Sequence, residues 1–269
     1  MITTYIIGKN SNLSKYLHQK IENSILVSSR EIIEGKEIQV KDNSNIIFNN
    51  FQPSTGLQNH LKPIDYINNA IMSTALTLNM CKNVKINKVL YTSSSSVYGN
   101  NILCNERDDL KPLNLHASLK IANEELIKKF CMEHNIDYTI ARVFNMYGGD
   151  DKFSIISKII KAHKKDETLT IVNHGNAIRD FIHIDDVVDI YFKLLDKKDI
   201  PYLNIGTGIG NSIKNILDFL NNHNVQINTN NIKREELKIS TADIKLLDKN
   251  IEKTSFKNIE DYLKKEFNI

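Results

Sequence analysis

His116 and Lys120 are the two residues whose types and spacing most directly suggest chemistry. They stand four residues apart in a segment with helical spacing, so both side chains project from one face of a helix. An imidazole titrates at about 6.5 and can act as a general acid or base. Because a nearby ammonium lowers that pKa, we expect His116 to be mostly neutral and still able to donate one hydrogen bond.

Residues 8–14 form a second candidate site, a turn between an apolar strand and an amphipathic helix. A parallel sheet binds a dinucleotide pyrophosphate at such a turn, with the free N–H groups of the helix facing the phosphates. Gly8 is the only glycine of the usual three, and Ser11 and Ser14 occupy the other two positions. An ordinary serine-capped turn explains this segment alone equally well. The cofactor-binding residues predicted here are Gly8, Ser11, Asn12 and Leu13.

The end of the next strand bears on the choice of cofactor. It reads Val27-Ser28-Ser29-Arg30, with an arginine and without the carboxylate that would bind an adenosine ribose 2′-hydroxyl. A guanidinium suits a 2′-phosphate, so Ser28 and Arg30 favour NADP(H) over NAD(H). The alternative interpretation of Arg30 is a solvated loop side chain.

The elements that must position these groups alternate between two types. Short β-branched runs are separated by longer segments in which apolar residues have helical spacing. The runs lie at residues 5–7, 25–27, 46–48, 89–91 and 138–141. This alternation predicts βαβ units and an α/β fold, a Rossmann-type doubly wound parallel sheet that binds ligands at the carboxyl ends of its strands.

Composition excludes several classes of protein. The chain has 269 residues, 41% of them hydrophobic and 25% charged, so it can bury a core without disulfides or metal. A net charge of +3 predicts no nucleic-acid partner, and no stretch is apolar enough to span a membrane. Three cysteines without metal-ligand spacing are typical of reduced thiols, so we expect a cytoplasmic protein with no metal site.

Several further motifs follow one another in order along most of the chain. They are a serine-rich strand end finishing in VYG (97–99) and followed by Glu106, Pro112 and Lys120; KPIDYINN (62–69); RVFNMYG (142–148); GNAIRDFIHIDD (175–186); and NIGTG (204–208). This pattern resembles the extended short-chain dehydrogenase/reductase family of nucleotide-sugar epimerases, dehydratases and 4-keto reductases. One landmark departs, because His116 stands where the family has the tyrosine of Y-x-x-x-K.

The resemblance implies roles for individual residues. Ser94 would polarise a sugar carbonyl, His116 would supply the proton, and Lys120 would hold the nicotinamide ribose. The further contacts that the resemblance implies are Asn49 and Asn69 for the cofactor, and Ser93, Tyr98, Asn145, Arg179 and Arg234 for the substrate. Arg179 would bind the diphosphate, whereas Arg234, beside two glutamates, is equally well explained as a surface ion pair.

Three interpretations of His116 remain open. It is the working acid, or it orients the substrate while Tyr98 or a water delivers the proton, or it marks a chain that has lost catalysis. The loss of two glycines from residues 8–14 favours the third interpretation, and the retained Ser94 and Lys120 oppose it.

The prediction for the whole chain is an NADP(H)-dependent reductase or epimerase acting at a 4-keto or 4-hydroxyl carbon of a nucleotide-diphosphate sugar, in surface polysaccharide synthesis. The alternative is a catalytically silent nucleotide-sugar-binding member that partners an active paralogue. We expect a Rossmann domain at residues 1–150 plus 177–208 and a small discontinuous substrate domain at 151–176 plus 209–269. The resemblance also implies a homodimer formed through the helix of His116 and its neighbour, and apolar Ile121, Leu126 and Ile127 fit such a helix without proving the interface.

Overall fold

The structure is a computed structural model that describes residues 2–50, 63–252 and 255–269. At its centre lies a sheet of six parallel strands in the order β10-β6-β4-β3-β1-β2. The strands are β1 (Thr4–Ile7), β2 (Ser24–Val27), β3 (Ser44–Phe48), β4 (Ile86–Ser94), β6 (Asp137–Val143) and β10 (Tyr202–Ile205). All five strand runs expected from the sequence lie in this sheet, which confirms the prediction of a Rossmann-type parallel sheet.

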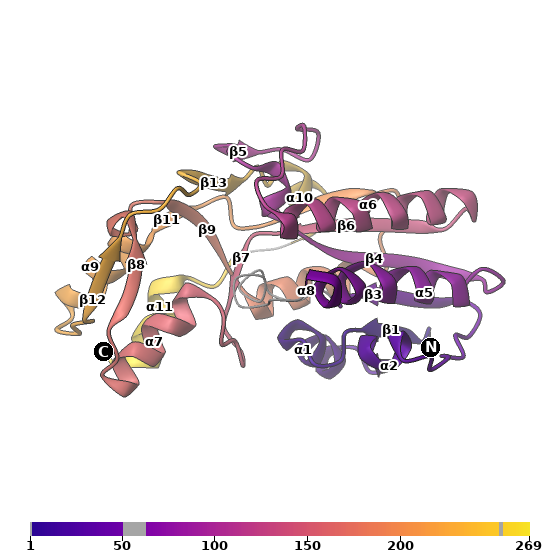
Figure 1. Ribbon diagram of the computed structural model, residues 1–269, viewed down its shortest axis with the longest axis horizontal. Coiled ribbons are helices and arrows are strands. Elements are labelled where there is room, and N and C mark those ends of the chain that lie inside the picture. The colour runs from indigo at the N-terminus through magenta and orange to yellow at the C-terminus, as the bar shows by residue number, and fades with distance from the viewer. Residues whose placement is uncertain (1, 51–62, 253–254) are drawn as a thin grey trace.

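Helices cover both faces of this sheet (Figure 1). On one face lie α1 (Asn12–Lys20), α8 (Ile184–Leu194) and α10 (Lys245–Asn250). On the other lie α2 (Ser29–Ile33), α5 (Ser73–Met80) and α6 (Leu115–Glu133). Along the chain, α4 (Pro63–Ile67) and a π-helical turn (Asn68–Met72) lead directly into α5.

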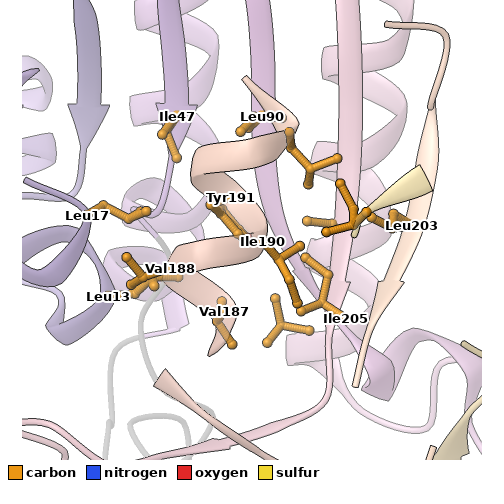
Figure 2. Close-up of a cluster of buried hydrophobic side chains, with 14 of the residues drawn as sticks. Leu13, Leu17, Ile47, Leu90, Val187, Val188, Ile190, Tyr191, Leu203 and Ile205 are labelled. Carbon is orange, nitrogen blue, oxygen red and sulfur yellow. The ribbon is translucent and has the colours of Figure 1, made fainter. Parts of the chain in front are cut away.

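Alternation along the strands explains why both faces are covered. Ile6 of β1 packs toward α1 and α8, whereas Tyr5 and Ile7 pack toward α2, α5 and α6. Figure 2 shows the centre of the first face, where α8 places Val187, Val188, Ile190 and Tyr191 against Leu13 and Leu17 of α1 and against Ile47, Leu90, Leu203 and Ile205 of the sheet. Each such side chain contributes about 1.5–3 kcal/mol by leaving water.

The order of the strands reverses beside β1, which has β2 on one side and β3 on the other. Ligands of doubly wound sheets bind at the carboxyl ends of the strands next to such a reversal. Gly8 follows β1, Asn49 follows β3, and Ser93 and Ser94 end β4. The topology therefore brings the predicted cofactor and catalytic segments to one edge of the sheet.

A second, smaller unit lies beside this edge (Figure 1). Its larger sheet has the order β11-β9-β13-β5, with β7 also paired to β9, and its smaller sheet pairs β8 with β12. The strands are β5 (Leu103–Cys104), β7 (Asn145–Tyr147), β8 (Leu169–Val172), β9 (Ile178–His183), β11 (Gly210–Ser212), β12 (Thr229–Ile232) and β13 (Ile239–Ala242). α7 (Ile155–Lys165), α9 (Ile213–Asn222) and α11 (Ile259–Phe267) pack with β7, β8 and β9 around one hydrophobic cluster.

Four elements lie elsewhere than the expected domain boundaries place them: β5, β7, β9 and α10. β5, β7 and β9, expected within the Rossmann domain, belong to the second sheet, where β9 pairs with β7, β11 and β13 and β5 pairs with β13. α10, expected within the substrate domain, packs Leu247 and Ile251 into the core of the first sheet. The chain therefore crosses between the two units more often than the motifs suggest, and α8 and β10 lie with the first sheet.

Two further expectations concern membranes and cysteines. No helix in the described ranges is both long and apolar enough to cross a membrane. Cys81, Cys104 and Cys131 are free and buried.

Candidate active site

The turn after β1 is held by the side chain of Asn49. Its amide donates hydrogen bonds to the hydroxyls of Ser11 (2.7 Å) and Ser14 (3.0 Å). Gly8 has a φ of +104°, and a Cβ there would lie 2.3 Å from the Asn49 carbonyl oxygen. Gly8 is therefore required at its position, and the two serines fasten the turn to β3 instead of adding flexibility.

The first turn of α1 remains open to an anion. Ser11 is its N-cap residue, yet no side-chain capping bond forms at this end within the described residues. The Asn12 side chain is used elsewhere, since it donates to the Gly148 carbonyl (3.0 Å) and accepts from the Asp150 N–H (3.1 Å). Leu13 is buried in the core, so Asn12 and Leu13 can serve a cofactor only through their backbone N–H groups.

Arg30 lies on α2, immediately beyond the end of β2. The Ser28 hydroxyl caps this helix by accepting from the Glu31 N–H at 3.3 Å. Arg30 is exposed, and within the described ranges no hydrogen bond or ion pair holds its guanidinium. Its side chain is therefore free of partners among the described residues, whereas Ser28 has a structural partner.

Lys120 is a buried cation at the end of β4. Its side chain is 5% exposed, and its Nζ donates to the Thr92 carbonyl at 2.6 Å and lies 5.1 Å from the centre of the Tyr91 ring. Burial lowers the Lys120 pKa from 10.5 to about 7, and the Glu124 carboxylate opposes this change. At neutral pH the lysine is thus poised between its two protonation states.

His116 lies one turn before Lys120 and is half-buried. Its pKa is lowered from 6.5 to about 3, first by burial and second by the Lys120 ammonium. This direction agrees with the neutral imidazole expected from the sequence, and burial, not the ammonium, is the larger cause. His116 can therefore donate one N–H to a substrate oxygen without carrying a charge.

This lowered pKa makes stability depend on pH. Above 6.5 both the folded and unfolded forms of His116 are neutral, and between 6.5 and about 3 only the unfolded chain takes up a proton. We therefore expect His116→Asn to lose about 1–2 kcal/mol less of its free energy of unfolding than the wild type between pH 7 and pH 5. Urea unfolding at the two pH values measures this difference. His163→Asn, at an exposed position on α7, is the control, and equal losses in all three proteins would contradict the assignment.

The serine-rich end of β4 divides into two environments. Ser94 is half-buried and caps the 3₁₀ turn Ser95–Tyr98, accepting from the N–H (3.2 Å) and the hydroxyl (3.0 Å) of Ser96. Ser93 is buried and donates to Glu124. Tyr98 is also buried, and its hydroxyl donates to Asn204 at 2.7 Å. The structure therefore brings Ser94 to the site but directs Ser93 and Tyr98, both predicted substrate contacts, into the protein interior.

Both residues belong to a buried network around an ion pair that the sequence interpretation missed. Arg142 Nη2 lies 2.8 Å from Glu124 Oε2, and both side chains are at most 4% exposed. Arg142 also donates to the Tyr98 hydroxyl (3.1 Å), and its guanidinium lies between the rings of Tyr98 and Tyr202, 5.0 and 4.9 Å from their centres. Arg142 is the first residue of the motif RVFNMYG, and Glu124 stands four residues after Lys120 on the same helix. Their positions in the sequence could therefore have marked both as candidate site residues.

Arg179 and Arg234 lie in the second unit, near one another. Arg179 is 18% exposed, and its Nη2 lies 3.4 Å from the Glu236 carboxylate. The Asn173 amide donates to that carboxylate (3.0 Å) and to the Arg234 carbonyl (2.6 Å), so Glu236 links Arg179 to the segment that carries Arg234. An open cavity of about 520 Å³ adjoins Arg234, and it is lined by Asn173, His174, Asn176, Lys233, Arg234 and Glu235. Arg234 is exposed, so neither of its two interpretations is excluded.

The remaining predicted residues lie between the two units. Asn145, on β7, is exposed, and in the described part of the chain no hydrogen bond holds its amide. Asn69 lies in the π-helical turn that precedes α5 and is half-buried. Residue 62, the first of its motif, lies outside the described residues. No cluster of three or more metal-binding side chains occurs in the ranges that the structure covers.

Asp180 connects two of the sequence motifs, GNAIRDFIHIDD (175–186) and NIGTG (204–208). It is fully buried, and its carboxylate accepts from the Thr207 N–H (2.8 Å), the Thr207 hydroxyl (2.7 Å), the Gly208 N–H (2.8 Å) and the Ala242 N–H (3.1 Å). A Cβ on Gly206 would lie 2.7 Å from this carboxylate. Asp180 thus fixes the strand that carries Arg179 against residues 206–208.

The chain matches one family of known proteins over most of its length. The model of the NAD dependent epimerase/dehydratase family matches residues 13–206. Protein CapI from Staphylococcus aureus is 33% identical over 144 residues, which are 52% of this chain and 43% of that protein. UDP-glucuronic acid decarboxylase 5 from Arabidopsis thaliana is 26% identical over 213 residues, 75% of this chain and 60% of that protein. The chain thus matches about half the length of these two relatives.

Among solved structures, the chain is similar to UDP-glucuronic acid 4-epimerase from Bacillus cereus in complex with UDP-glucuronic acid and NAD. The TM-score is 0.87 at 22% identity, and the alignment covers 99% of this chain and 98% of that one. At this identity the likeness shows the fold, a parallel Rossmann-type sheet with a smaller second unit.

Proposed function

Because the chain belongs to the NAD-dependent epimerase/dehydratase family, we propose that it is an NADP(H)-dependent reductase or epimerase that acts at the 4-keto or 4-hydroxyl carbon of a nucleotide-diphosphate sugar. The observation that carries this proposal is the position of Lys120. Its ammonium lies 2.6 Å from the carbonyl of Thr92, two residues before Ser94, and His116 lies one turn away. An acid–base pair and a hydroxyl therefore share the ligand-binding edge of the sheet. Surface polysaccharide synthesis remains the expected setting.

The cofactor side fits a dinucleotide. The uncapped first turn of α1 offers N–H groups to a pyrophosphate, and Gly8 lets the chain pass close to β3. Asn69 and Lys120 would face the nicotinamide half. A bound nicotinamide would accept or supply the hydride, which is chemistry that amino-acid side chains cannot perform.

The proton step falls to His116 and Lys120. The neutral imidazole would donate its N–H to the substrate oxygen, with Ser94 donating to the same atom. Lys120, with a pKa of about 7, is protonated in a large fraction of molecules at neutral pH and would replace the proton. Tyr98 does not fit this role, because its hydroxyl is buried on Asn204 and burial raises its pKa. The alternative in which Tyr98 delivers the proton is therefore set aside.

The substrate side supports a nucleotide-diphosphate sugar. Arg234 lines the cavity of about 520 Å³, and Arg179 is linked to the same segment by its ion pair with Glu236. Guanidinium groups bind diphosphate oxygens in fixed, paired geometry. The exposed amide of Asn145 on β7 supplies a further polar contact. UDP-glucuronic acid, the ligand of the Bacillus cereus epimerase, is the first substrate to test.

Binding and turnover test this proposal in sequence. The purified protein is titrated with NADPH and with NADH at fixed salt, and nicotinamide fluorescence is followed. Saturable NADPH binding, followed by conversion of a 4-keto sugar nucleotide or epimerisation of a UDP-sugar, is the expected result. A folded protein, free of carried-over cofactor, that binds a sugar nucleotide but neither NADPH nor NADH would overturn the proposal and support the silent alternative. His116→Tyr, which restores the family tyrosine, is expected to shift the pH optimum of the active enzyme, whereas a silent chain would gain activity.

The proposed preference for NADP(H) rests on Arg30. We expect Arg30→Ala to weaken NADPH binding about tenfold, because it removes a charge-assisted contact to the 2′-phosphate, and to leave NADH binding unchanged. The measurement is the same fluorescence titration. Arg107→Ala, which removes another exposed arginine, is the control. If Arg30→Ala weakened the binding of NADPH and NADH equally, or weakened neither, Arg30 would be a solvated loop side chain without a role in cofactor choice.

A homodimer in the cytoplasm remains part of the proposal. The residues first expected in the interface do not support it, because Ile127 is buried in the chain's own core and Leu126 and Ile121 pack against its clusters. Exposed apolar side chains lie instead on α4 and the π-helical turn, at Ile64, Ile67 and Met72. Light scattering during gel filtration would distinguish a dimer from a monomer.

A further inference from the structure

Glu124 is a buried carboxylate on the same helix as the proposed acid–base pair, one turn beyond Lys120. It is 1% exposed and accepts from Ser93, from Arg142 Nη2 at 2.8 Å and from Arg142 Nε at 3.3 Å. A buried carboxylate is costly unless such donors surround it. The arrangement thus joins α6, β4 and β6 through one side chain.

The network places Glu124 where it controls the end of β4. Ser93 precedes Ser94 directly and stands opposite Arg142 in the β4–β6 pairing. Arg142 continues the network to the Glu106 carbonyl (3.2 Å) and to Tyr98. Since Ser93 is anchored from α6, the orientation of Ser94 is fixed relative to the helix that carries His116 and Lys120.

The charges around Lys120 show a second effect of Glu124. On its own helix Lys120 has the neutral His116 and the anionic Glu124, and from β4 it faces the Tyr91 ring. The Arg142 guanidinium, on β6, is paired with the same carboxylate, and Tyr191 of α8 donates to the Thr92 hydroxyl (2.8 Å). Glu124 is the titratable group of this set whose charge favours the ammonium form of the lysine, in addition to the Thr92 carbonyl and the Tyr91 ring.

We propose that Glu124 is a positioning residue that holds the serine end of β4 against α6 and supplies the negative charge beside the buried Lys120 ammonium. This inference deepens the proposed function, because it concerns the groups assigned there to the proton step. It divides the role of one carboxylate into a geometric part, exerted through Ser93, and an electrostatic part, exerted on Lys120.

Glu124→Gln separates the charge from the shape. Without the carboxylate, the titration midpoint of Lys120 is expected to fall by about one pH unit, since an opposite charge that favours the ammonium is gone. The midpoint is read by NMR of ¹³C-labelled lysine side chains in the protein without substrate, with Lys120→Arg identifying the signal. The matched control is Glu125→Gln, the exposed neighbour that pairs with Lys128, and it should leave the midpoint unchanged.

Two further variants keep the inference testable if Glu124→Gln does not fold, which could follow from leaving Arg142 unpaired. Ser93→Ala should leave the Lys120 midpoint in place and lower kcat about tenfold through misplacement of Ser94. Glu124→Asp keeps the charge and should keep the Lys120 midpoint, while lowering kcat as Ser93→Ala does.

An unchanged Lys120 midpoint in folded Glu124→Gln, or an equal change in Glu125→Gln, would overturn the electrostatic part. Full kcat in Ser93→Ala would overturn the geometric part. Because the NMR titration needs neither cofactor nor substrate, its outcome is independent of whether a nucleotide sugar is turned over, and failure of the proposed function is distinguished from failure of this inference.

Discussion

Replacing Lys120 by methionine is expected to lower kcat by about a thousandfold, the largest effect on activity that we predict. The substitution removes the only residue of the proposed proton step whose pKa, about 7, matches neutral pH. Methionine has a similar length and is apolar, so it fills the same buried space. Steady-state turnover of the sugar nucleotide measures the loss, and unfolding by urea verifies that the variant is folded.

The matched control is Lys128→Met on the same helix. Lys128 is partly exposed and pairs only weakly with Glu125, at 3.4 Å, so its removal should leave kcat within a factor of two. The pH profile provides a second criterion. In the wild type the rate should change around pH 7, where Lys120 gains or loses its proton, and in Lys120→Met this change should be missing. A variant that keeps more than a tenth of the wild-type kcat would contradict the assignment of Lys120 to the proton step.

Asp180→Asn is expected to lower the free energy of unfolding by about 2–4 kcal/mol, the largest effect on stability. One carboxylate oxygen accepts from the Thr207 backbone N–H, and the other accepts from those of Gly208 and Ala242. Whichever way the asparagine amide is turned, its NH₂ group faces at least one of these donors. Urea unfolding followed by circular dichroism measures the loss.

Asp218→Asn, at an exposed position on α9, tests whether the loss is specific to burial. Asp218 pairs with Lys214 at 3.0 Å on the surface, and removing its charge should cost less than about 0.5 kcal/mol. Because Asp180 holds β9 against residues 206–208, we also expect Asp180→Asn to weaken sugar-nucleotide binding through Arg179. An Asp180→Asn protein as stable as the wild type would show that these hydrogen bonds are not needed in the folded state.

The sequence predicts the central sheet well because a strand buried on both faces has a distinctive composition. All five runs expected there are strands of the first sheet. The strands of the second unit are harder to predict from the sequence, because they are short and pair with segments distant along the chain. β9, with the sequence IRDFIH, carries Arg179, Asp180 and His183 among its apolar residues, and its pairing with β7, β11 and β13 shows where it belongs.

The residues of the candidate site are likewise only partly predictable from the sequence. Motif spacing locates Lys120, His116 and Arg179, but it does not reveal which acceptor each donor reaches. Tyr98 and Ser93 occupy motif positions beside the site, and yet their hydroxyls bind Asn204 and Glu124 in the interior. The extent of His116 burial, which dominates its pKa, also depends on tertiary packing that no local pattern encodes.

The fastening of residues 8–14 by Asn49 has a consequence for the thermodynamics of cofactor binding. A glycine-rich turn loses conformational freedom when a pyrophosphate orders it. Here the Ser11 and Ser14 hydroxyls are bound to the Asn49 amide, directly after β3, before any ligand arrives, so that ordering occurs during folding. The entropic penalty of binding should accordingly be small, and calorimetry should show it increase in Asn49→Ala.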